Sequence, residues 1–183
     1  MNHSKEKFLS SERLPVKVIC DTVRYHGNVG TMLKTFFYLN CQEFILTKGS
    51  VDIWNPKTLE ASDGCQLFHH NYITTEQSWH DINHLIPRDA LVFYAESEKL
   101  SQHKNFLEYK NLDCVLSCRK NIVLIIGGET EGVSNEAKDF CSSRNGHAVF
   151  IPMRKEVESL NGGVAASILL FEMARILKKN IEI

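Results

Sequence analysis

Short apolar runs recur along this chain, and segments with helical periodicity separate them. Several of the runs are continuously apolar, which is typical of strands buried on both faces of a sheet. The expected strands are 16–20, 43–47, 66–74, 91–95, 122–126 and 147–151.

Helical patterns occupy the segments between these runs. The first begins at Asn28, a residue type that caps helices, and places its apolar residues on one side. Another has Asn55 as its cap and Pro56 at its first helical position. The last is long and apolar and ends in lysines, which suit the carboxyl end of a helix. The helices are expected at 28–39, 55–62, 134–143 and 160–179.

The alternation of strands and helices predicts an α/β domain with a mainly parallel sheet flanked by helices. With 183 residues the chain is long enough for one domain with a substantial core. We expect that domain over 16–183 and an N-terminal extension over 1–15. The extension mixes acids with bases and lacks an apolar core, so we expect neither a secretory signal nor a good transit peptide in it.

Charge and cysteine content narrow the classes of partner. Lys and Arg total 21 against 22 Asp and Glu, so a nucleic-acid partner would need a local basic patch. No apolar run has the length of a membrane span, and we expect no membrane partner. The six cysteines are scattered and several lie in apolar runs, which favours reduced, structural cysteines in an intracellular protein.

The segment "HDINH" (80–84) nearly matches the helix signature of zinc proteases, with Asp81 where glutamate is expected. The shorter acid would withdraw the base from a metal-bound water, and the nearby Pro87 limits the helix. We therefore expect a polar surface turn and no metal site. His69 and His70 are expected on a strand, where neighbours point to opposite faces and cannot chelate one ion.

Two further stretches combine polar residues with glycine. In "HGNVGTMLK" (26–34), Asn28 either caps a helix or faces, together with Lys34, a site at the helix start where free amides favour anions. In "IVLIIGGETEGVSNEA" (122–137), a strand meets glycines whose spacing fits neither common phosphate-binding pattern.

The segment "ESLNGG" (158–163) is the third such stretch. Ser159 and Asn161 are polar residues at the entrance of an apolar helix, where capping is the simplest role. The two glycines that follow each cost about 1 kcal/mol of helix propensity relative to Ala. Their backbone is therefore expected to lie close to a ligand or to another chain segment.

In order and content, these blocks resemble the SpoU/TrmH branch of the SPOUT RNA methyltransferases. The segment "NVGTMLK" is similar to a family block of Asn-x-Gly followed four residues later by Arg. The segment "GGETEGVS" matches Gly-x-Glu-x-x-Gly after a strand, and "IPMRKEVESLNGGVAASILLFE" matches Ile-Pro-Met followed by Glu-Ser-Leu-Asn and an alanine-rich helix. The resemblance covers residues 16–179, and its detail is similar to the mitochondrial large-subunit rRNA 2′-O-ribose methyltransferases.

The resemblance implies a SPOUT fold whose C-terminal third forms a deep trefoil knot, an arrangement nearly absent from other proteins. It also implies a homodimer with S-adenosylmethionine (SAM) as cofactor. The implied reaction is methylation of a ribose 2′-hydroxyl in RNA, with rRNA favoured over tRNA. We expect an intracellular location, in the mitochondrion or the cytoplasm.

The resemblance also assigns site residues. Asn28 and Glu129 would shape the catalytic pocket, Ser159 and Asn161 would organise it, and Lys34 would occupy the position of the family's basic catalytic group. A ribose hydroxyl is a weak nucleophile and needs such a partner. The cofactor would be held by the backbone around Ile126, Gly127, Gly128, Glu129, Gly132, Ile151, Pro152, Met153, Leu160 and Asn161.

The chain departs from the family pattern at four positions. Lys34 stands in place of Arg, Lys155 in place of a glycine, and Glu60 and Asp63 in place of Arg and Met. Lys is a point donor and lacks the fixed fork of Arg, so Lys34 is compatible with activity or with its loss. The alternative function is a catalytically degenerate homodimer that binds RNA or acts in ribosome assembly.

Overall fold

The computed structural model describes residues 13–97, 105–116 and 121–179. In this part of the chain one seven-stranded sheet has the order β3-β2-β1-β6-β4-β7-β5, and every pair of neighbours is parallel. The predicted α/β class with a mainly parallel sheet is confirmed. The strands are β1 (Leu14–Asp21), β2 (Cys41–Thr47), β3 (Ile73–Gln77), β4 (Leu91–Ala95), β5 (Phe106–Glu108), β6 (Ile122–Gly127) and β7 (His147–Phe150).

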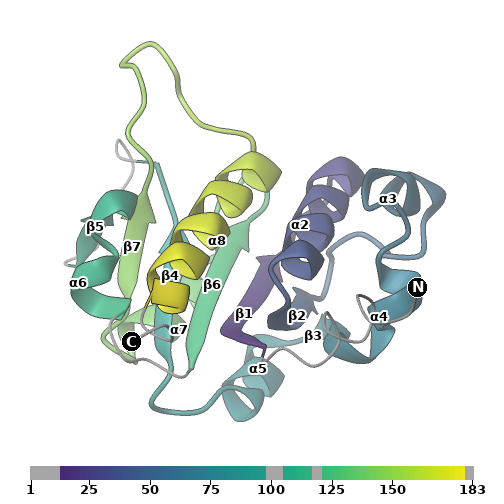
Figure 1. The fold of residues 1–183 in the computed structure, drawn as a ribbon, viewed down its shortest axis with the longest axis horizontal. Coiled ribbons are helices and arrows are strands. Elements are labelled where there is room, and N and C mark those ends of the chain that lie inside the picture. The colour runs from purple at the N-terminus through teal and green to yellow at the C-terminus, as the bar shows by residue number, and fades with distance from the viewer. Residues whose placement is uncertain (1–12, 98–104, 117–120, 180–183) are drawn as a thin grey trace.

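Helices cover both faces of the sheet. Helices α2 and α8 lie side by side across one face (Figure 1), where Met32 and Met173 enter the larger core cluster. Helices α5 and α7 supply Ile82 and Phe140 to the cluster on the other face. The helices are α2 (His26–Tyr38), α3 (Pro56–Ala61), α4 (Gln66–His69), α5 (Trp79–Leu85), α6 (Asp113–Leu116), α7 (Asn135–Ser142) and α8 (Gly162–Lys179), with 3-10 turns η1 (His70–Tyr72) and η2 (Tyr109–Asn111).

The central strand β6 is apolar on both sides because helices cover both faces. Leu124 and Ile126 point into the cluster beneath α2 and α8, whereas Val123 and Ile125 point into the cluster beneath α5 and α7. A strand in this position has no exposed face that calls for polar residues. The continuous apolar run therefore predicted this strand without any alternation.

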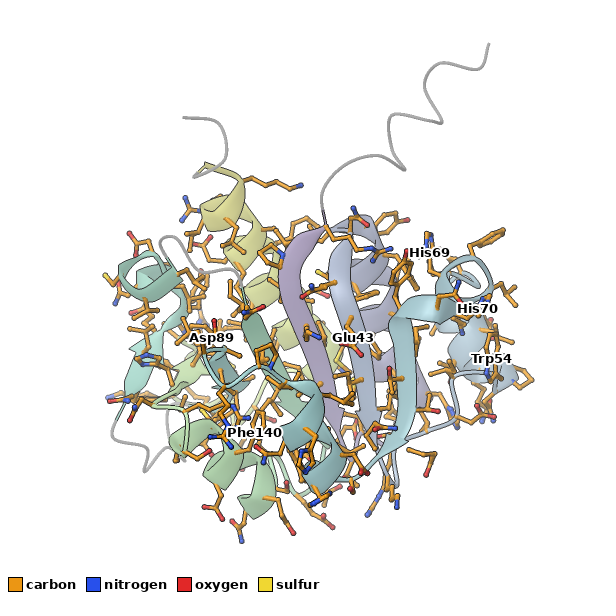
Figure 2. The ribbon with its side chains drawn as sticks, turned by 90° about the horizontal axis from the view of Figure 1, so that it is seen from below. Glu43, Trp54, His69, His70, Asp89 and Phe140 are labelled. Carbon is orange, nitrogen blue, oxygen red and sulfur yellow. The ribbon has the colours of Figure 1, made fainter. Side chains whose placement is uncertain are left out.

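Part of the sheet around β2 carries polar side chains instead (Figure 2). Lys17 on β1 donates a hydrogen bond of 2.5 Å to Glu43 Oε2, and Thr74 on β3 donates one of 3.2 Å to Glu43 Oε1. Glu43 thereby links three neighbouring strands. Polar residues of this kind are usual on sheet faces that contact solvent. Here these polar residues lie on the part of the sheet face that the helices leave partly open.

The strand expected over 66–74 is wrong, because most of this segment forms α4 and η1. Gln66 is fully buried, and its amide donates to the Ile53 carbonyl oxygen at 2.7 Å. Leu67 and Phe68 are 58% and 80% exposed. In this segment the polar residue is buried and the apolar residues are exposed, so the apolar run did not indicate a buried strand. His69 and His70 consequently lie on the helical turns that precede β3 in the chain, not on a strand (Figure 2).

The surface turn expected for "HDINH" is also wrong, because these residues lie in α5. A capping box starts this helix: Ser78 Oγ accepts from the amide of Asp81, and the Asp81 carboxylate accepts from the amide of Ser78. The helix ends before Pro87, so the proline does not disturb it. The described residues contain no group of three or more His, Cys, Asp or Glu that could hold a metal ion.

The predicted helix starts have mixed outcomes. The cap at Asn28 is wrong, because α2 begins at His26 and Asn28 lies inside its first turn. The cap at Asn55 is confirmed, since its side chain accepts from the amide of Lys57 at 3.0 Å and Pro56 follows at the first helical position. The short elements β5, η2 and α6 were not predicted, because three or four residues carry no periodicity.

The cysteines of the described part of the chain are free, and three of the five are buried. Burial raises the pKa of the Cys41 thiol to about 12, and burial also raises that of Cys141 to about 12. Such thiols stay protonated, which agrees with a structural role. Cys118 and residues 1–12 of the N-terminal extension lie outside the described residues. No described helix combines the length and apolar character needed to cross a membrane.

Candidate active site

The candidate residues gather at the edge where the parallel strands end. β1 and β6 are neighbours at the centre of the sheet, and Asp21 pairs in register with Gly127 at their carboxyl ends. β2 and β3 lie on one side of β1, and the later strands lie on the other, so the order reverses beside β1. Ligands of open parallel sheets bind in the crevice outside such a reversal point.

The turn after β6 folds back on itself. The amide of Gly132 donates to the carbonyl oxygen of Gly128 at 3.0 Å. A Cβ atom at Gly127 would lie 2.2 Å from the carbonyl carbon of Gly132, so the two strands of the turn approach too closely for a side chain. Gly132 has a φ of +69°, in the left-handed region that favours glycine. These glycines build a compact turn with residues 129–131 at its tip.

This turn meets the first turn of α2. The Asn28 side-chain amide donates a hydrogen bond of 2.6 Å to Glu129 Oε1. Asn28 is only 3% exposed, whereas Glu129 is exposed. Because Oε1 takes this bond, the second oxygen of the carboxylate can accept another. The structure thus brings together the two residues that the sequence placed in one catalytic pocket.

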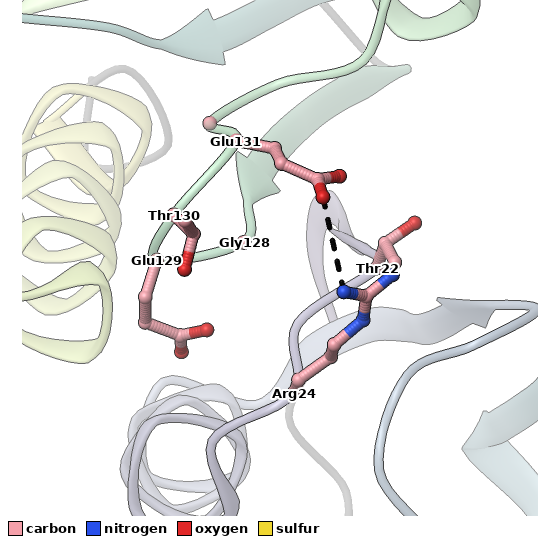
Figure 3. Close-up of a pocket in the computed structure, with 7 residues that line it drawn as sticks. Thr22, Arg24, Gly128, Glu129, Thr130 and Glu131 are labelled. Carbon is pink, nitrogen blue, oxygen red and sulfur yellow. Dashed lines mark ion pairs between the residues drawn. The ribbon is translucent and has the colours of Figure 1, made fainter.

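An open pocket lies between this turn and the segment that follows β1 (Figure 3). It is lined by Thr22, Arg24 and the turn 128–132. Arg24 Nη1 lies 3.8 Å from Glu131 Oε1, and the two side chains are 66% and 74% exposed. The lining therefore combines hydroxyl groups, carboxylates and one guanidinium with the backbone of the glycine turn.

Asp21 holds the end of this turn in place through hydrogen bonds. No sequence motif marks this residue. It is 1% exposed at the end of β1. Its Oδ2 accepts from the amide of Ser134 at 2.7 Å, and its Oδ1 accepts from Trp79 Nε1 at 3.3 Å. The carboxylate thereby ties the start of α7, just after the turn, to β1 and α5. An acid that ends a buried apolar strand was the available sequence signal.

The amino end of α8 packs against α2. A Cβ atom at Gly163 would lie 3.1 Å from Thr31 Cβ and 3.3 Å from the carbonyl oxygen of Asn28. The neighbour expected for this glycine is therefore another chain segment. Asn161 Oδ1 accepts from the amide of Val164 at 3.2 Å, which is the capping contact expected of it.

Lys34 does not join this cluster. Its ammonium group forms an ion pair with the carboxylate of Asp63. Asn28 points elsewhere, because the two residues are roughly 120° apart around α2 and about 9 Å apart along it. The hydrogen bond to Asp63 raises the pKa of Lys34 above its ordinary value. In this arrangement Lys34 is held protonated and cannot accept a proton.

The residues predicted to hold a cofactor share the carboxyl edge of the sheet. Residues 126–129 end β6 and enter the glycine turn. Residues 151–153 begin the long loop after β7, and residues 159–161 end it. Figure 1 shows this loop rising above the carboxyl ends of the strands before α8 begins. Ser159 is exposed in the loop, and Leu160 is partly buried.

Two polar side chains that were not predicted lie beside this edge. Glu96 and Ser97 follow β4, which lies between β6 and β7. Lys138 Nζ donates to Glu96 Oε1 at 2.8 Å, and the Glu96 side chain is 9% exposed. Glu96 Oε2 and Ser97 Oγ are buried and have no hydrogen-bond partner among the described residues. Buried groups in this state are rare and require a partner such as a ligand or a water molecule.

A comparison with protein families gives a match over most of the chain. The model of the SpoU rRNA Methylase family matches residues 15–171. The chain belongs to the SpoU rRNA methylase family. The contact between Asn28 and Glu129 is therefore where the first and second family blocks meet in this SpoU chain.

Curated relatives of this SpoU chain include rRNA methyltransferase 3, mitochondrial, of Mus musculus. That protein is 32% identical over an alignment of 204 positions with gaps, and the match covers 92% of this chain and 48% of the relative. The 23S rRNA (uridine(2479)-2′-O)-methyltransferase of Streptomyces viridochromogenes is 25% identical over 172 residues, which cover 90% of this chain and 55% of the relative. The chain thus spans about half the length of these relatives.

Solved structures give the same fold. The SpoU methyltransferase AviRb from Streptomyces viridochromogenes, in complex with the cofactor AdoMet, superposes with a TM-score of 0.72. It is 20% identical, and the match covers 92% of this chain and 60% of AviRb. At this identity the likeness establishes that the parallel sheet and its helices follow the fold of a SpoU methyltransferase.

Proposed function

We propose that this SpoU-family chain transfers a methyl group from SAM to a ribose 2′-hydroxyl of RNA, with rRNA favoured over tRNA. The observation that carries the proposal is the hydrogen bond between Asn28 and Glu129 beside an open pocket. The names of the mouse and Streptomyces relatives support rRNA as the substrate, and the Streptomyces name supports the 2′-oxygen as the acceptor.

SAM is the proposed methyl donor, and the AdoMet complex of AviRb supports it. The residues present fit a nucleoside of this kind. The turn 126–129 and the loop 151–153 offer backbone and apolar contacts, and Glu96 and Ser97 offer buried polar atoms that require a partner. When bound, SAM supplies a methyl group on a sulfonium that is already a good leaving group.

The task of the chain's own residues is to position and activate the ribose hydroxyl. Asn28 holds one oxygen of Glu129, so the other oxygen is the proposed acceptor for a hydrogen bond or proton from the 2′-hydroxyl. In-line placement of the hydroxyl supplies much of the remaining acceleration. In this proposal Glu129 takes the role of base, because Lys34 is held protonated by Asp63.

Calorimetric titration with SAM and with S-adenosylhomocysteine tests the cofactor. Mass spectrometry of ribose methylation in rRNA and tRNA, incubated with and without the protein, tests the reaction. We expect Glu129→Gln to retain SAM binding and to lose methyl transfer. A protein that binds neither nucleoside would overturn the proposal.

A degenerate homodimer that binds RNA or a ribosome-assembly partner is the second candidate. The pair between Lys34 and Asp63 favours it, because both residues depart from the family pattern and neutralise each other. Under this candidate the wild type transfers no methyl group, so methyl transfer by the wild type to rRNA or tRNA would overturn it. The double variant Lys34→Arg/Asp63→Met restores the family residue types, and methyl transfer gained only by this variant would assign the lost activity to the pair.

We further propose a homodimer, a trefoil knot in the C-terminal third and a mitochondrial or cytoplasmic location. Val164 and Phe171 on α8 are 44% and 57% exposed, as suits a helix that packs against a second copy. The family resemblance supports the knot. The mitochondrial names of the mammalian relatives support a mitochondrial location.

A further inference from the structure

An RNA methyltransferase needs a group that binds the phosphate next to the reacting ribose. The guanidinium group of Arg and the ammonium group of Lys are suited to binding a phosphate. Lys34 stands at the position of the family's basic residue, but its ammonium group is already paired with Asp63. The pair raises the pKa of Lys34, so its charge persists but is neutralised by a neighbouring carboxylate.

Arg24 is the one cation among the residues that line the pocket (Figure 3). It comes from the segment after β1, whereas Glu129 comes from the turn after β6, and both line the same pocket. A 2′-hydroxyl at Glu129 is separated by only a few bonds from the 3′-phosphate of the same nucleotide. Arg24 and Glu129 thus line one pocket, where the 3′-phosphate and the 2′-hydroxyl of a single nucleotide are the groups suited to them.

Arg24 is held only loosely. Its Nη1 atom is 3.8 Å from Glu131 Oε1, which is beyond hydrogen-bonding distance. Both side chains are largely exposed, at 66% and 74%, so water screens the pair. A phosphate offers the planar guanidinium two hydrogen bonds at once, which is a better partner than this distant carboxylate.

We propose that Arg24 binds the RNA phosphate beside the reacting ribose, and that Glu131 is the counter-ion that this phosphate displaces. The inference rests on the proposed function and deepens it, because it names the residue that replaces Lys34 as the positioning cation. Glu131 then weakens RNA binding, since its carboxylate both competes for Arg24 and repels the incoming phosphate.

Salt-dependent RNA binding tests this directly. Fluorescence anisotropy of a fluorescein-labelled RNA hairpin would be measured over a range of NaCl concentrations for the full chain and its variants. Arg24→Ala should weaken binding about tenfold and reduce the slope of log K against log salt by about 0.7 to 0.9, the contribution of one phosphate contact. Arg24→Lys should restore the slope but only part of the affinity. Glu131→Gln should tighten binding several-fold.

Arg88→Ala is the matched control, because Arg88 is an exposed arginine before β4, at the opposite edge of the sheet. It should leave affinity and slope unchanged. Calorimetric SAM binding by each variant separates a local effect from a damaged fold, and Arg24→Ala should bind SAM as the wild type does.

If the wild type methylates RNA, two results would overturn this inference alone. One is a salt slope that falls in Lys34→Ala but not in Arg24→Ala. The other is weaker RNA binding by the Glu131→Gln variant than by the wild type. A wild type that binds neither SAM nor the hairpin would overturn the proposed function, and this inference with it. The two failures are thus distinguishable.

Discussion

Asn28 shows how burial sets the importance of a single polar residue. Its side chain is almost completely buried, yet its amide reaches a carboxylate on an exposed turn. Water can solvate Glu129 when this bond breaks, but it has little access to Asn28. The pair therefore matters for the position of Glu129 as well as for stability.

A double-mutant cycle measures this contact. We expect Asn28→Ala and Glu129→Ala to show a coupling free energy of about 1.5 kcal/mol, the low end for a bond to a charged group, because Glu129 is exposed. Urea unfolding of the wild type, both single variants and the double variant gives the coupling. A value near zero would mean that the two side chains do not interact in solution.

The pair between Lys34 and Asp63 leads to a pH prediction. A lysine whose pKa is raised on folding stabilises the protein fully below the ordinary lysine pKa of about 10.4, and this stabilisation disappears as the pH rises through the raised value. We expect the wild type to exceed Asp63→Asn in free energy of unfolding by a constant amount from about pH 6 to about pH 9. The difference should shrink above about pH 10.5.

Urea unfolding at graded pH checks this expectation, and added salt should reduce the difference because the pair is partly exposed. A difference that grows at alkaline pH would contradict the pairing. Across neutral pH, Lys34 should contribute no step to a pH–rate profile.

At the scale of elements, the glycine turn after β6 is the most constrained piece of the site. Gly127→Ala places a methyl group within 2.2 Å of backbone that cannot rotate away. We expect a loss of about 1–3 kcal/mol in the free energy of unfolding, as for overpacked sites, together with loss of SAM binding. Urea unfolding and calorimetry measure the two effects.

Gly132 is the matched control within the same turn. Apart from the glycine and its two chain neighbours, no atom of the described residues lies within 4 Å of a Cβ built there, and its φ of +69° is what disfavours a side chain. Gly132→Ala should cost about 1–2 kcal/mol, and Gly132→Asn less, because Asn tolerates the left-handed region. Equal losses for Gly127→Ala and Gly132→Asn would show that close contact is not what excludes a side chain from Gly127.

How well the sequence predicted each element depended on whether pattern and burial agree. β6 was predicted because both of its faces are buried and its residues are apolar, so pattern and burial agree. Residues 66–72 were misassigned because buried Gln66 is satisfied by hydrogen bonds while Phe68 faces solvent. Helix α5 was missed because a capping box starts it at Ser78 and the helix is complete before Pro87, so the proline does not limit it.

The contact between Asn28 and Glu129 was predictable, because family blocks carry both residues. Asp21 was not, because its burial depends on Ser134 and Trp79, which are distant in sequence. Lys34 and Asp63 each stood out as departures from the family pattern. Their contact could not be foreseen, since it depends on α3 packing so closely on α2 that a Cβ at Gly30 would lie 2.4 Å from Ala61 Cβ.

At the scale of the whole molecule, the two long helices on one face have different surroundings. Helix α2 lies between α8 and α3, as Figure 1 shows, whereas α8 exposes apolar residues on its outer side. Val164, Ile168 and Phe171 follow each other at spacings that place them on one face of a helix. A second copy is the proposed cover of this face.

Phe171→Glu tests the dimer, because it would bury a charge in the proposed contact. We expect the dissociation constant to rise about 100-fold or more, so that sedimentation velocity shows monomer at concentrations where the wild type is dimeric. Phe68→Glu is the control: Phe68 is 80% exposed on α4, away from α8, and its substitution should leave the dimer intact. Dissociation by Phe68→Glu, or none by Phe171→Glu, would place the interface elsewhere.

The contact between Asn28 and Glu129 forms within one chain, so a monomeric variant that still binds SAM would show that the cofactor site is complete in a single copy. Loss of SAM binding on dissociation would instead mean that the second copy completes the site.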